Sequence, residues 1–436
     1  MPAMSRLAAV LAAFLLSLAA CGGPAPSTDP SATASPAATT SPDAGASATP
    51  RPSASPTPAP SGDTAALFRE IEDQVVAERG LEAKQRLKPT ILSAEEARTR
   101  LEDLFWAENS TDNVATAEET LKALGLLPAD ASLGDLYVEM FRSQVAGYYD
   151  PRADELFVVS RSRAMGAADR VTLAHEFTHA LQDQHFDVQG ISSDTAPPRD
   201  RQLGRLALVE GDATLLMTRW LTDHLTIAEL QELLVVDPEA LAQLETMPAI
   251  LRERMLFPYQ QGLLFVNGIW ARGGWEAVDR AYDRPPDSTE QVLHPEKYEA
   301  GEKPVDVPLD AAALAREMGD GWTGTPEDTL GEFQLAVWLR ENGVEATSAG
   351  EASAGWGGDR LAYLRGPKGA YALVLLTAWD SQADADEFLE AATTAAGNVP
   401  GAAAARVIPT QGVDRVAVLI ASDASTLDRL ATAAGG

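Results

Sequence analysis

The stretch Val171–Leu181 reads Val-Thr-Leu-Ala-His-Glu-Phe-Thr-His-Ala-Leu and decides how the rest of the chain is interpreted. Its apolar residues recur at helical spacing, and Asp169 just before it is the expected N-cap of a helix. On a helix, His175 and His179 lie one turn apart on the same face, where two imidazoles can share a zinc ion. Glu176 lies beside them and can polarise a water without serving as a ligand. A chance match on an amphipathic helix is the alternative.

A second predicted helix, Leu203–Met217, supplies the expected third ligand. Glu210 falls within its apolar stripe, where a carboxylate is costly to bury unless it has a partner. A divalent cation is a suitable partner, so we expect Glu210 to bind the metal. Ligation by Asp212, or two carboxylates hydrogen-bonded within the core, are the alternatives. Gly211, a weak helix former, suggests that the backbone passes close to the metal site here.

The composition limits the classes of partner and of metal site. Lys and Arg number 34 and Asp and Glu 64, giving a formal net charge of -30 over 436 residues. Such a chain repels phosphate backbones, so nucleic acid is not an expected partner. The single cysteine excludes a disulfide framework and a site built from several thiolates. Any metal must therefore be held by histidine and carboxylate.

The N-terminal sequence predicts export. Arg6 precedes the apolar run Leu7–Leu18, and Leu-Ala-Ala-Cys ends at Cys21, so residues 1–21 resemble a lipoprotein signal peptide with a lipobox. Lipidated Cys21 would anchor the protein to the outer face of the bacterial cell membrane. An ordinary signal peptide cut nearby, or a short anchor helix, are the alternatives. Residues 22–63, rich in Ala, Ser, Thr and Pro, predict a disordered tether.

A hairpin is predicted ahead of the metal helix. Two β-prone runs, Val145–Tyr149 and Glu155–Val159, flank an Asp-Pro turn. Zinc peptidases commonly bind the substrate backbone along a strand edge beside the metal helix. The hairpin either provides such an edge or only packs against the helix.

Candidate donors to a developing oxyanion lie further along the chain. His294, in a polar segment, and Tyr259, in a short break between two predicted helices, could each donate to a tetrahedral intermediate. A histidine that caps a turn is the alternative for His294. Of the remaining histidines, His185 is expected at a helix end or behind a ligand, and His224 at the surface.

The last part of the chain is predicted to contain strands as well as helices. Strands are predicted within 361–365, 370–379, 406–409 and 413–422, and helices within 381–396 and 425–433. This order suggests a small antiparallel sheet with helices on one face, serving packing or substrate gating. We therefore predict an α+β fold: a mostly helical domain with a small β-hairpin or sheet at 64–345, and a C-terminal α/β module with a small antiparallel sheet at 346–436.

The chain resembles a family of bacterial exported zinc metallopeptidases of gluzincin type, most of them uncharacterised. The stretches that carry the resemblance are Ala146–Pro151, Thr172–Phe186, Leu208–Ala213, Phe257–Tyr259, Ser288–Tyr298 and Ala354–Asp359. The resemblance implies that residues 64–345 form a zincin-like metallopeptidase domain, that His175, His179 and Glu210 bind zinc and that Glu176 is the catalytic carboxylate. The usual thermolysin arrangement places an aspartate four residues after the ligand glutamate. Thr214 stands there in this chain, so support behind the ligands must differ and could come from Asp212.

The leading hypothesis is a lipid-anchored zinc peptidase, in particular an endopeptidase, that hydrolyses peptide or protein substrates with a zinc-activated water and Glu176 as general base. One alternative is a non-catalytic binding lipoprotein with structural zinc. A structural site would usually have a fourth protein ligand, whereas three ligands and an adjacent glutamate leave room for water. Another alternative is a zinc hydrolase of a non-peptide substrate. The sequence leaves the oligomeric state open.

Overall fold

The computed structural model of the protein describes residues 62–434 except 145–146, 151–154, 160–164, 193–198, 236–237, 402–403, 411 and 413. The predicted signal peptide, Cys21 and almost all of the predicted tether lie outside the described residues. No helix in the described part of the chain is long and apolar enough to cross a membrane.

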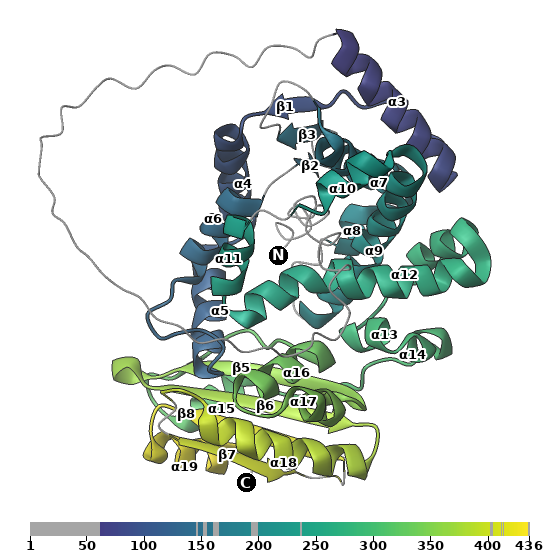
Figure 1. The fold of residues 1–436 in the computed structure, drawn as a ribbon. Helices are drawn as coiled ribbons and strands as arrows, with labels where there is room; N and C mark the ends of the chain where they lie inside the picture. Colours follow the sequence, from purple (N-terminus) through teal and green to yellow (C-terminus); the bar gives the residue numbers. More distant parts are fainter. Residues whose placement is uncertain are drawn as a thin grey trace, which may run out of the picture.

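The protein is a mostly helical α+β protein, which confirms the predicted fold class. A small mixed sheet lies among helices, and a five-stranded antiparallel sheet follows at the C-terminal end (Figure 1). The helices that precede the larger sheet are α3 (Gly62–Arg79), α4 (Ala94–Glu108), α5 (Thr111–Ala123), α6 (Leu133–Gln144), α7 (Ala167–Phe186), α8 (Val188–Ser192), α9 (Arg199–His224), α10 (Ile227–Leu233), α11 (Pro238–Thr246), α12 (Ala249–Asp283), α13 (Thr289–Leu293), α14 (Pro295–Ala300) and α15 (Ala311–Met318).

The small sheet confirms the predicted hairpin. Strand β2 (Gly147–Asp150) pairs antiparallel with β3 (Glu155–Val159), and the turn between them lies outside the described residues. Strand β1 (Thr90–Leu92) pairs parallel with β3 on its other side, so among the described strands β2 lies at one edge of the sheet. Gly147 lets β2 lie directly on α7, because a Cβ there would lie 3.0 Å from the side chain of Thr172.

Helix α7, which carries the two predicted histidine ligands, starts slightly before the predicted N-cap. Gly166 is the N-cap of α7, and Asp169 is the third residue of the helix, where its carboxylate accepts the backbone N–H of Gly166 at 2.9 Å. Asp169 therefore satisfies a backbone N–H at the start of the helix, as expected, but it does so from the third helical position and not as the N-cap.

Helix α12 differs from the predicted pair of helices separated by a break. It continues through Pro258, and its only residues with non-helical dihedral angles among those described are Gly273 and Gly274. A proline inside a helix removes one backbone hydrogen bond, and burial of the surrounding turn against α9 offsets that loss.

A close crossing of α9 and α12 explains Gly211. A Cβ on Gly211 would lie 2.2 Å from the carbonyl oxygen of Gly262, and a Cβ on Gly262 would lie 2.3 Å from that of Ala207. The close approach at Gly211 is therefore one between two helices, and not the expected approach of the backbone to the metal. The two backbones meet there, and this contact fixes α12 over α9.

The C-terminal sheet has the order β4-β5-β6-β8-β7. It follows the predicted β-β-α-β-β-α sequence, and its neighbouring strands are antiparallel. Its elements, with the two helices that precede β5, are β4 (Thr323–Gly324), α16 (Gly331–Glu341), α17 (Ala346–Ser353), β5 (Trp356–Arg365), β6 (Tyr371–Trp379), α18 (Gln382–Asn398), β7 (Ala404–Pro409), β8 (Arg415–Ala421) and α19 (Ala424–Ala433).

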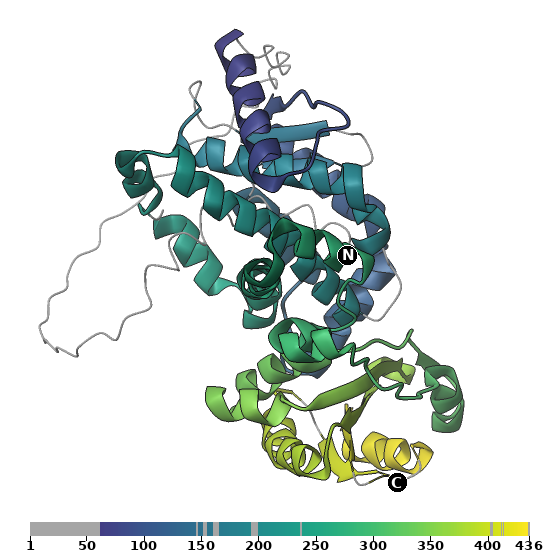
Figure 2. The same cartoon turned by 90° about the vertical axis from the view of Figure 1, so that its right-hand side faces the viewer.

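Helices cover both faces of this sheet, so the prediction of helices on one face is wrong (Figure 2). Leu373 of β6 packs with Phe388 of α18, whereas its neighbour Ala372 belongs to the cluster that contains Leu427 of α19. Successive strand residues point to opposite faces, so both faces must be apolar. The prediction failed because a continuous apolar run does not show which helix covers which face.

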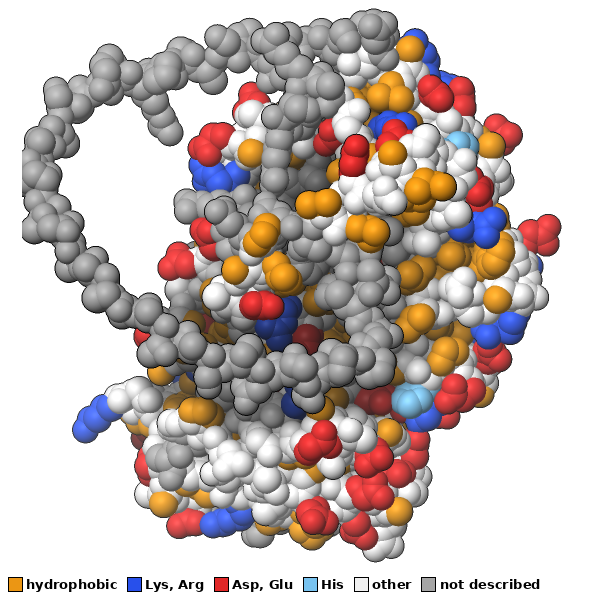
Figure 3. Space-filling view, in the orientation of Figure 1, with side chains coloured by type: hydrophobic (Ala, Val, Ile, Leu, Met, Phe, Trp, Pro, Cys, Tyr) orange, Lys and Arg blue, Asp and Glu red, His pale blue; other side chains and the backbone are white. Residues whose placement is uncertain are grey.

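One hydrophobic cluster continues from α4–α6 into α16, α18 and the sheet. The indole of Trp338 also donates to the carbonyl oxygen of Leu124 at 3.1 Å. The domain boundary at 345/346 stays a prediction. Acidic side chains outnumber basic ones on the face of the C-terminal part shown in Figure 3, in keeping with the net charge of -30.

Candidate metal centre

Three buried side chains from two helices converge between α7 and α9. The Nε2 atoms of His175 and His179 lie 3.0 Å apart. The Oε2 atom of Glu210 lies 3.4 Å from the first and 3.2 Å from the second. These three residues could hold a metal ion.

The spacing of these atoms suits a small tetrahedral cation. Zinc bonds of about 2.0–2.1 Å imply tetrahedral edges of about 3.3–3.4 Å, close to the three observed distances. Both carboxylate oxygens of Glu210 and Nδ1 of His175 are buried and lack a hydrogen-bond partner among the described residues. Buried polar atoms without partners are costly, and a cation would satisfy the carboxylate. The residues therefore fit zinc.

The attraction between Glu210 and the two imidazoles determines which of these side chains are charged. Burial opposes the charge of Glu210, but His179 and the contacts to both imidazoles outweigh burial and hold the pKa of Glu210 below its ordinary value. Burial also opposes protonation of His179, yet the neighbouring Glu210 raises the pKa of His179 to about 9. Burial lowers the pKa of His175. The anionic glutamate thus favours positive charge at this point, whether a proton or a metal cation.

Glu176 lies at the same place without belonging to the metal-binding group. It is buried, and its carboxylate accepts the backbone N–H of Tyr149 in β2. Burial raises the pKa of Glu176 to about 8. A carboxyl group whose pKa lies near neutrality can both accept and release a proton during a reaction. Strand β2 therefore fixes a candidate general base beside the metal ligands.

Tyr259 reaches the same centre from α12. Its ring centroid lies 6.2 Å from that of His175, with 30° between the ring planes. Burial, followed by the charges of Glu210 and Glu176, raises the pKa of Tyr259 well above its ordinary value. The hydroxyl therefore keeps its proton and can act as a hydrogen-bond donor.

His294 lies elsewhere, at the junction of α13 and α14. Its Nε2 is 2.9 Å from Oε1 of Glu332, and its Nδ1 is 3.6 Å from Glu296. None of its hydrogen bonds or ion pairs in the described structure joins it to the metal-binding group. The structure thus brings Tyr259, but not His294, to the three ligands.

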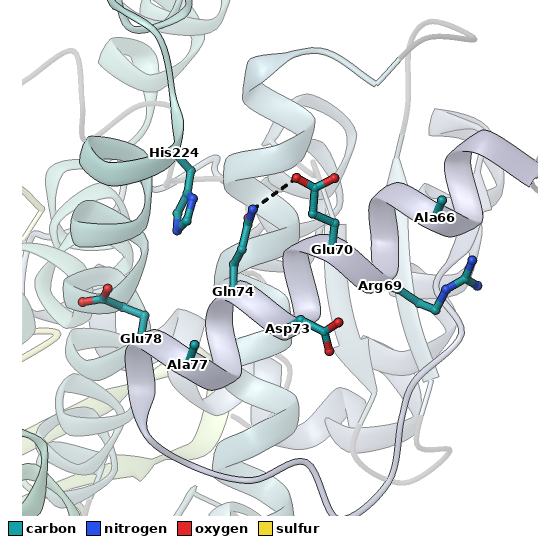
Figure 4. Close-up of a pocket in the computed structure, with 8 residues that line it drawn as sticks. All are labelled: Ala66, Arg69, Glu70, Asp73, Gln74, Ala77, Glu78 and His224. Carbon is teal, nitrogen blue, oxygen red and sulfur yellow. Dashed lines mark hydrogen bonds between the residues drawn. The ribbon is translucent and has the colours of Figure 1, made fainter.

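The other two histidines also lie outside the centre. The Nε2 atom of His185 is 2.8 Å from the carbonyl oxygen of Glu82, which places His185 at a helix end rather than behind a ligand. His224, near the end of α9, helps to line a surface pocket of about 670 Å³ against α3 (Figure 4).

Another group of carboxylates has the spacing of a metal site, namely Glu290, Glu302 and Asp380. The ammonium group of Lys297 pairs with all three of them. A cation from the protein itself therefore already neutralises this acidic group.

Sequence reasoning missed two residues behind the candidate metal ligands. Gln182 bonds to Nδ1 of His179 at 2.8 Å and to Asp212 at 3.0 Å. Arg79, at the end of α3, forms a buried ion pair with Asp212. The position of Gln182, three residues after His179 on the same helix face, was a usable signal. Arg79 gave no such signal, because it lies 133 residues from Asp212.

Comparisons with known proteins do not identify the candidate metal centre. A family described as a domain of unknown function (DUF8575) matches residues 316–431, which leaves the metal centre outside the match. No curated protein matches the chain. The crystal structure of a proposed hydrolase with a novel fold from Chloroflexus aurantiacus is similar over 55% of this chain and 90% of that one, with 16% identity and a TM-score of 0.34. So loose a likeness carries no functional argument.

Proposed function

We propose that the protein is a zinc-dependent hydrolase, and more narrowly a peptidase that cleaves within peptide chains. The observation that carries this proposal is the buried group of His175, His179 and Glu210 with Glu176 directly beside it. A structural zinc site would usually be closed by a fourth protein ligand, and the group in the described residues has three.

The chemistry divides among a few residues. Zinc held by the three ligands would act as a Lewis acid that polarises a carbonyl oxygen and lowers the pKa of water. Glu176 takes a proton from the attacking water and delivers it to the leaving amine. The hydroxyl of Tyr259 donates a hydrogen bond to the oxygen on which negative charge develops.

The choice of a peptide substrate is supported by the sheet beside the metal helix. Among the described strands, β2 lies at the edge of that sheet, and the backbone N–H of Tyr149 donates to the carboxylate of Glu176. An extended peptide that added to this edge would bring its backbone to the general base. An activated water could also hydrolyse an ester or another non-peptide bond. The position of strand β2 beside Glu176 is therefore the feature that favours a peptide substrate.

We also propose that the protein is exported and anchored through lipidated Cys21. The support is the signal-like sequence of residues 1–21 and the presence of a single cysteine directly at its end. Replacing Cys21 by Ser should move the protein from the membrane fraction to the soluble fraction. Persistence of the Cys21→Ser variant in the membrane fraction would refute this anchoring.

A peptide-library digest with wild type and Glu176→Gln tests the catalytic proposal. Glutamine keeps the shape of Glu176 but cannot act as a base, so turnover should fall at least about a hundredfold while zinc content stays near wild type. Glu72→Gln, which changes a buried glutamate of α3 outside the site, is the matched control and should keep its turnover. Equal cleavage by Glu176→Gln with zinc bound would rule out this centre.

A further inference from the structure

We propose that Gln182, Asp212 and Arg79 form a buried relay that fixes the His179 ring with its Nε2 toward the metal. This inference rests on the proposed metal centre and goes beyond it, because it makes α3, the first helix after the predicted tether, part of the support for a ligand from α7. The three residues act through His179 and are therefore positioning residues.

The side-chain amide of Gln182 has one possible orientation. Its nitrogen lies 2.9 Å from the carbonyl oxygen of Val209 and 3.0 Å from Oδ2 of Asp212. Both of those atoms can only accept hydrogen bonds, so the nitrogen of the amide must be the atom that faces them. The oxygen of Gln182 must then face Nδ1 of His179, at 2.8 Å.

That orientation selects the tautomer of His179 when it binds metal. An amide oxygen accepts hydrogen bonds, so Nδ1 of His179 must carry the ring proton. A neutral imidazole with its proton on Nδ1 has its lone pair on Nε2. That nitrogen is the one that lies 3.2 Å from Glu210. Gln182 thus holds the ring in the state that a metal ligand requires.

Asp212 is fixed in turn by donors from two other helices. Arg79 reaches its two oxygens at 2.9 and 3.2 Å, and the hydroxyl of Tyr282 in α12 lies 2.7 Å from Oδ2. Arg79 is fully buried and also pairs with Asp279 at 2.7 Å. Removing one partner of a buried ion pair leaves an uncompensated charge, so Asp212 depends strongly on Arg79.

Helix α3 places Arg79 against the metal helix and the ligand helix together. The helix packs on both α7 and α9, and Arg79 is its last residue. Its guanidinium lies over the ring of Trp275, 4.6 Å from the centroid. These contacts hold the guanidinium in one place. Arg79 in turn holds Asp212, Asp212 holds Gln182, and Gln182 holds the ring of His179.

The experiment measures zinc affinity by chelator competition, the visible spectrum of the cobalt-substituted protein, and thermal stability. Gln182→Leu removes the acceptor for Nδ1, so zinc should bind about 10- to 100-fold more weakly and the cobalt spectrum should change. Arg79→Met should weaken zinc binding in the same direction, and Arg79→Lys should restore most of the affinity because it keeps a cation beside Asp212.

Two variants control for a merely structural role. Gln334→Leu changes another buried glutamine, which bonds to the carbonyl oxygen of Leu330, and should lower stability without changing zinc affinity. Asp279→Asn removes the negative charge of the other partner of Arg79 but leaves the relay intact, so it should also bind zinc like wild type.

Wild-type zinc affinity and cobalt spectrum in Gln182→Leu would overturn the relay while leaving the proposed function standing. If Gln182→Leu does not fold, Asp212→Asn decides the question, because it breaks the same relay one step further from the ligand. Unchanged zinc affinity in Asp212→Asn would then overturn the relay. Absence of zinc from the wild type would overturn the proposed function and the relay together.

Discussion

The ring of Tyr259 lies over the imidazole of His175, with 6.2 Å between the ring centroids. The continuation of α12 through Pro258 produces this contact, because it places Tyr259 on a helix that packs on α9. The tyrosine hydroxyl stays protonated beside two glutamates and can serve as a donor. Under the proposed function, Tyr259 is therefore the better-placed candidate for the oxyanion donor than His294.

Tyr259→Phe should lower peptide turnover by about tenfold to a thousandfold, because it removes one donor to the developing negative charge. Zinc content should stay at the wild-type level, since the phenol is not among the three ligands. Steady-state kinetics with a peptide found in the library digest, together with zinc analysis, checks both statements.

His294→Ala is the matched comparison for Tyr259→Phe. It removes the partner of Glu332 at the junction of α13 and α14, so it should lower thermal stability while turnover per folded molecule stays near wild type. A larger loss of turnover in His294→Ala than in Tyr259→Phe would reverse the assignment.

Local patterns predicted much of the site. His175 and His179 follow from helical spacing, and Glu210 follows from the cost of burying an unpaired carboxylate. Other features depend on tertiary contacts that no local pattern reveals. Arg79 meets Asp212 across 133 residues. Strand β1 has only three residues and exists because it pairs with β3.

The same limit explains Pro258 and the C-terminal sheet. A proline usually ends or kinks a helix, and here tertiary packing, on α9 and on the cluster that includes α16, accompanies a helix that continues through the proline. The apolar strands of the C-terminal sheet were predictable, whereas their burial on both faces depends on where α18 and α19 lie.

Two helical glycines, one at the crossing of α9 and α12 and one in α17, should respond in opposite ways to replacement by alanine. Gly262→Ala would force a Cβ to within 2.3 Å of the carbonyl oxygen of Ala207, so it should destabilise the protein by about 1–3 kcal/mol. Gly350→Ala, in α17 with open space around it, should stabilise by about 0.5–1 kcal/mol. Denaturant unfolding measures both, and a neutral Gly262→Ala would contradict the close crossing.

The buried carboxyl of Asp359 should make stability depend on pH. Burial raises its pKa from 3.8 to about 6, although the backbone N–H groups of Leu330 and Gly331 oppose the shift. The folded protein therefore holds this proton more tightly than the unfolded chain. The stability contribution is complete below the unfolded pKa of 3.8 and is lost as the pH rises to about 6.

Denaturant unfolding of wild type and Asp359→Asn between these pH values isolates this effect. The free energy of unfolding of wild type, relative to that of the variant, should decrease as the pH rises through the window. A difference that stays constant would show that burial does not raise the pKa of Asp359, and a difference that grows with pH would show that its folded pKa is lowered.

The metal content of the purified protein tests the central claim most directly. Elemental analysis should find one zinc per chain in wild type and far less in His179→Ala and Glu210→Gln, because each change removes one of three ligands. His224→Ala, which alters a histidine at a surface pocket, should retain the full amount. Stoichiometric zinc in His179→Ala would contradict the assignment of this centre.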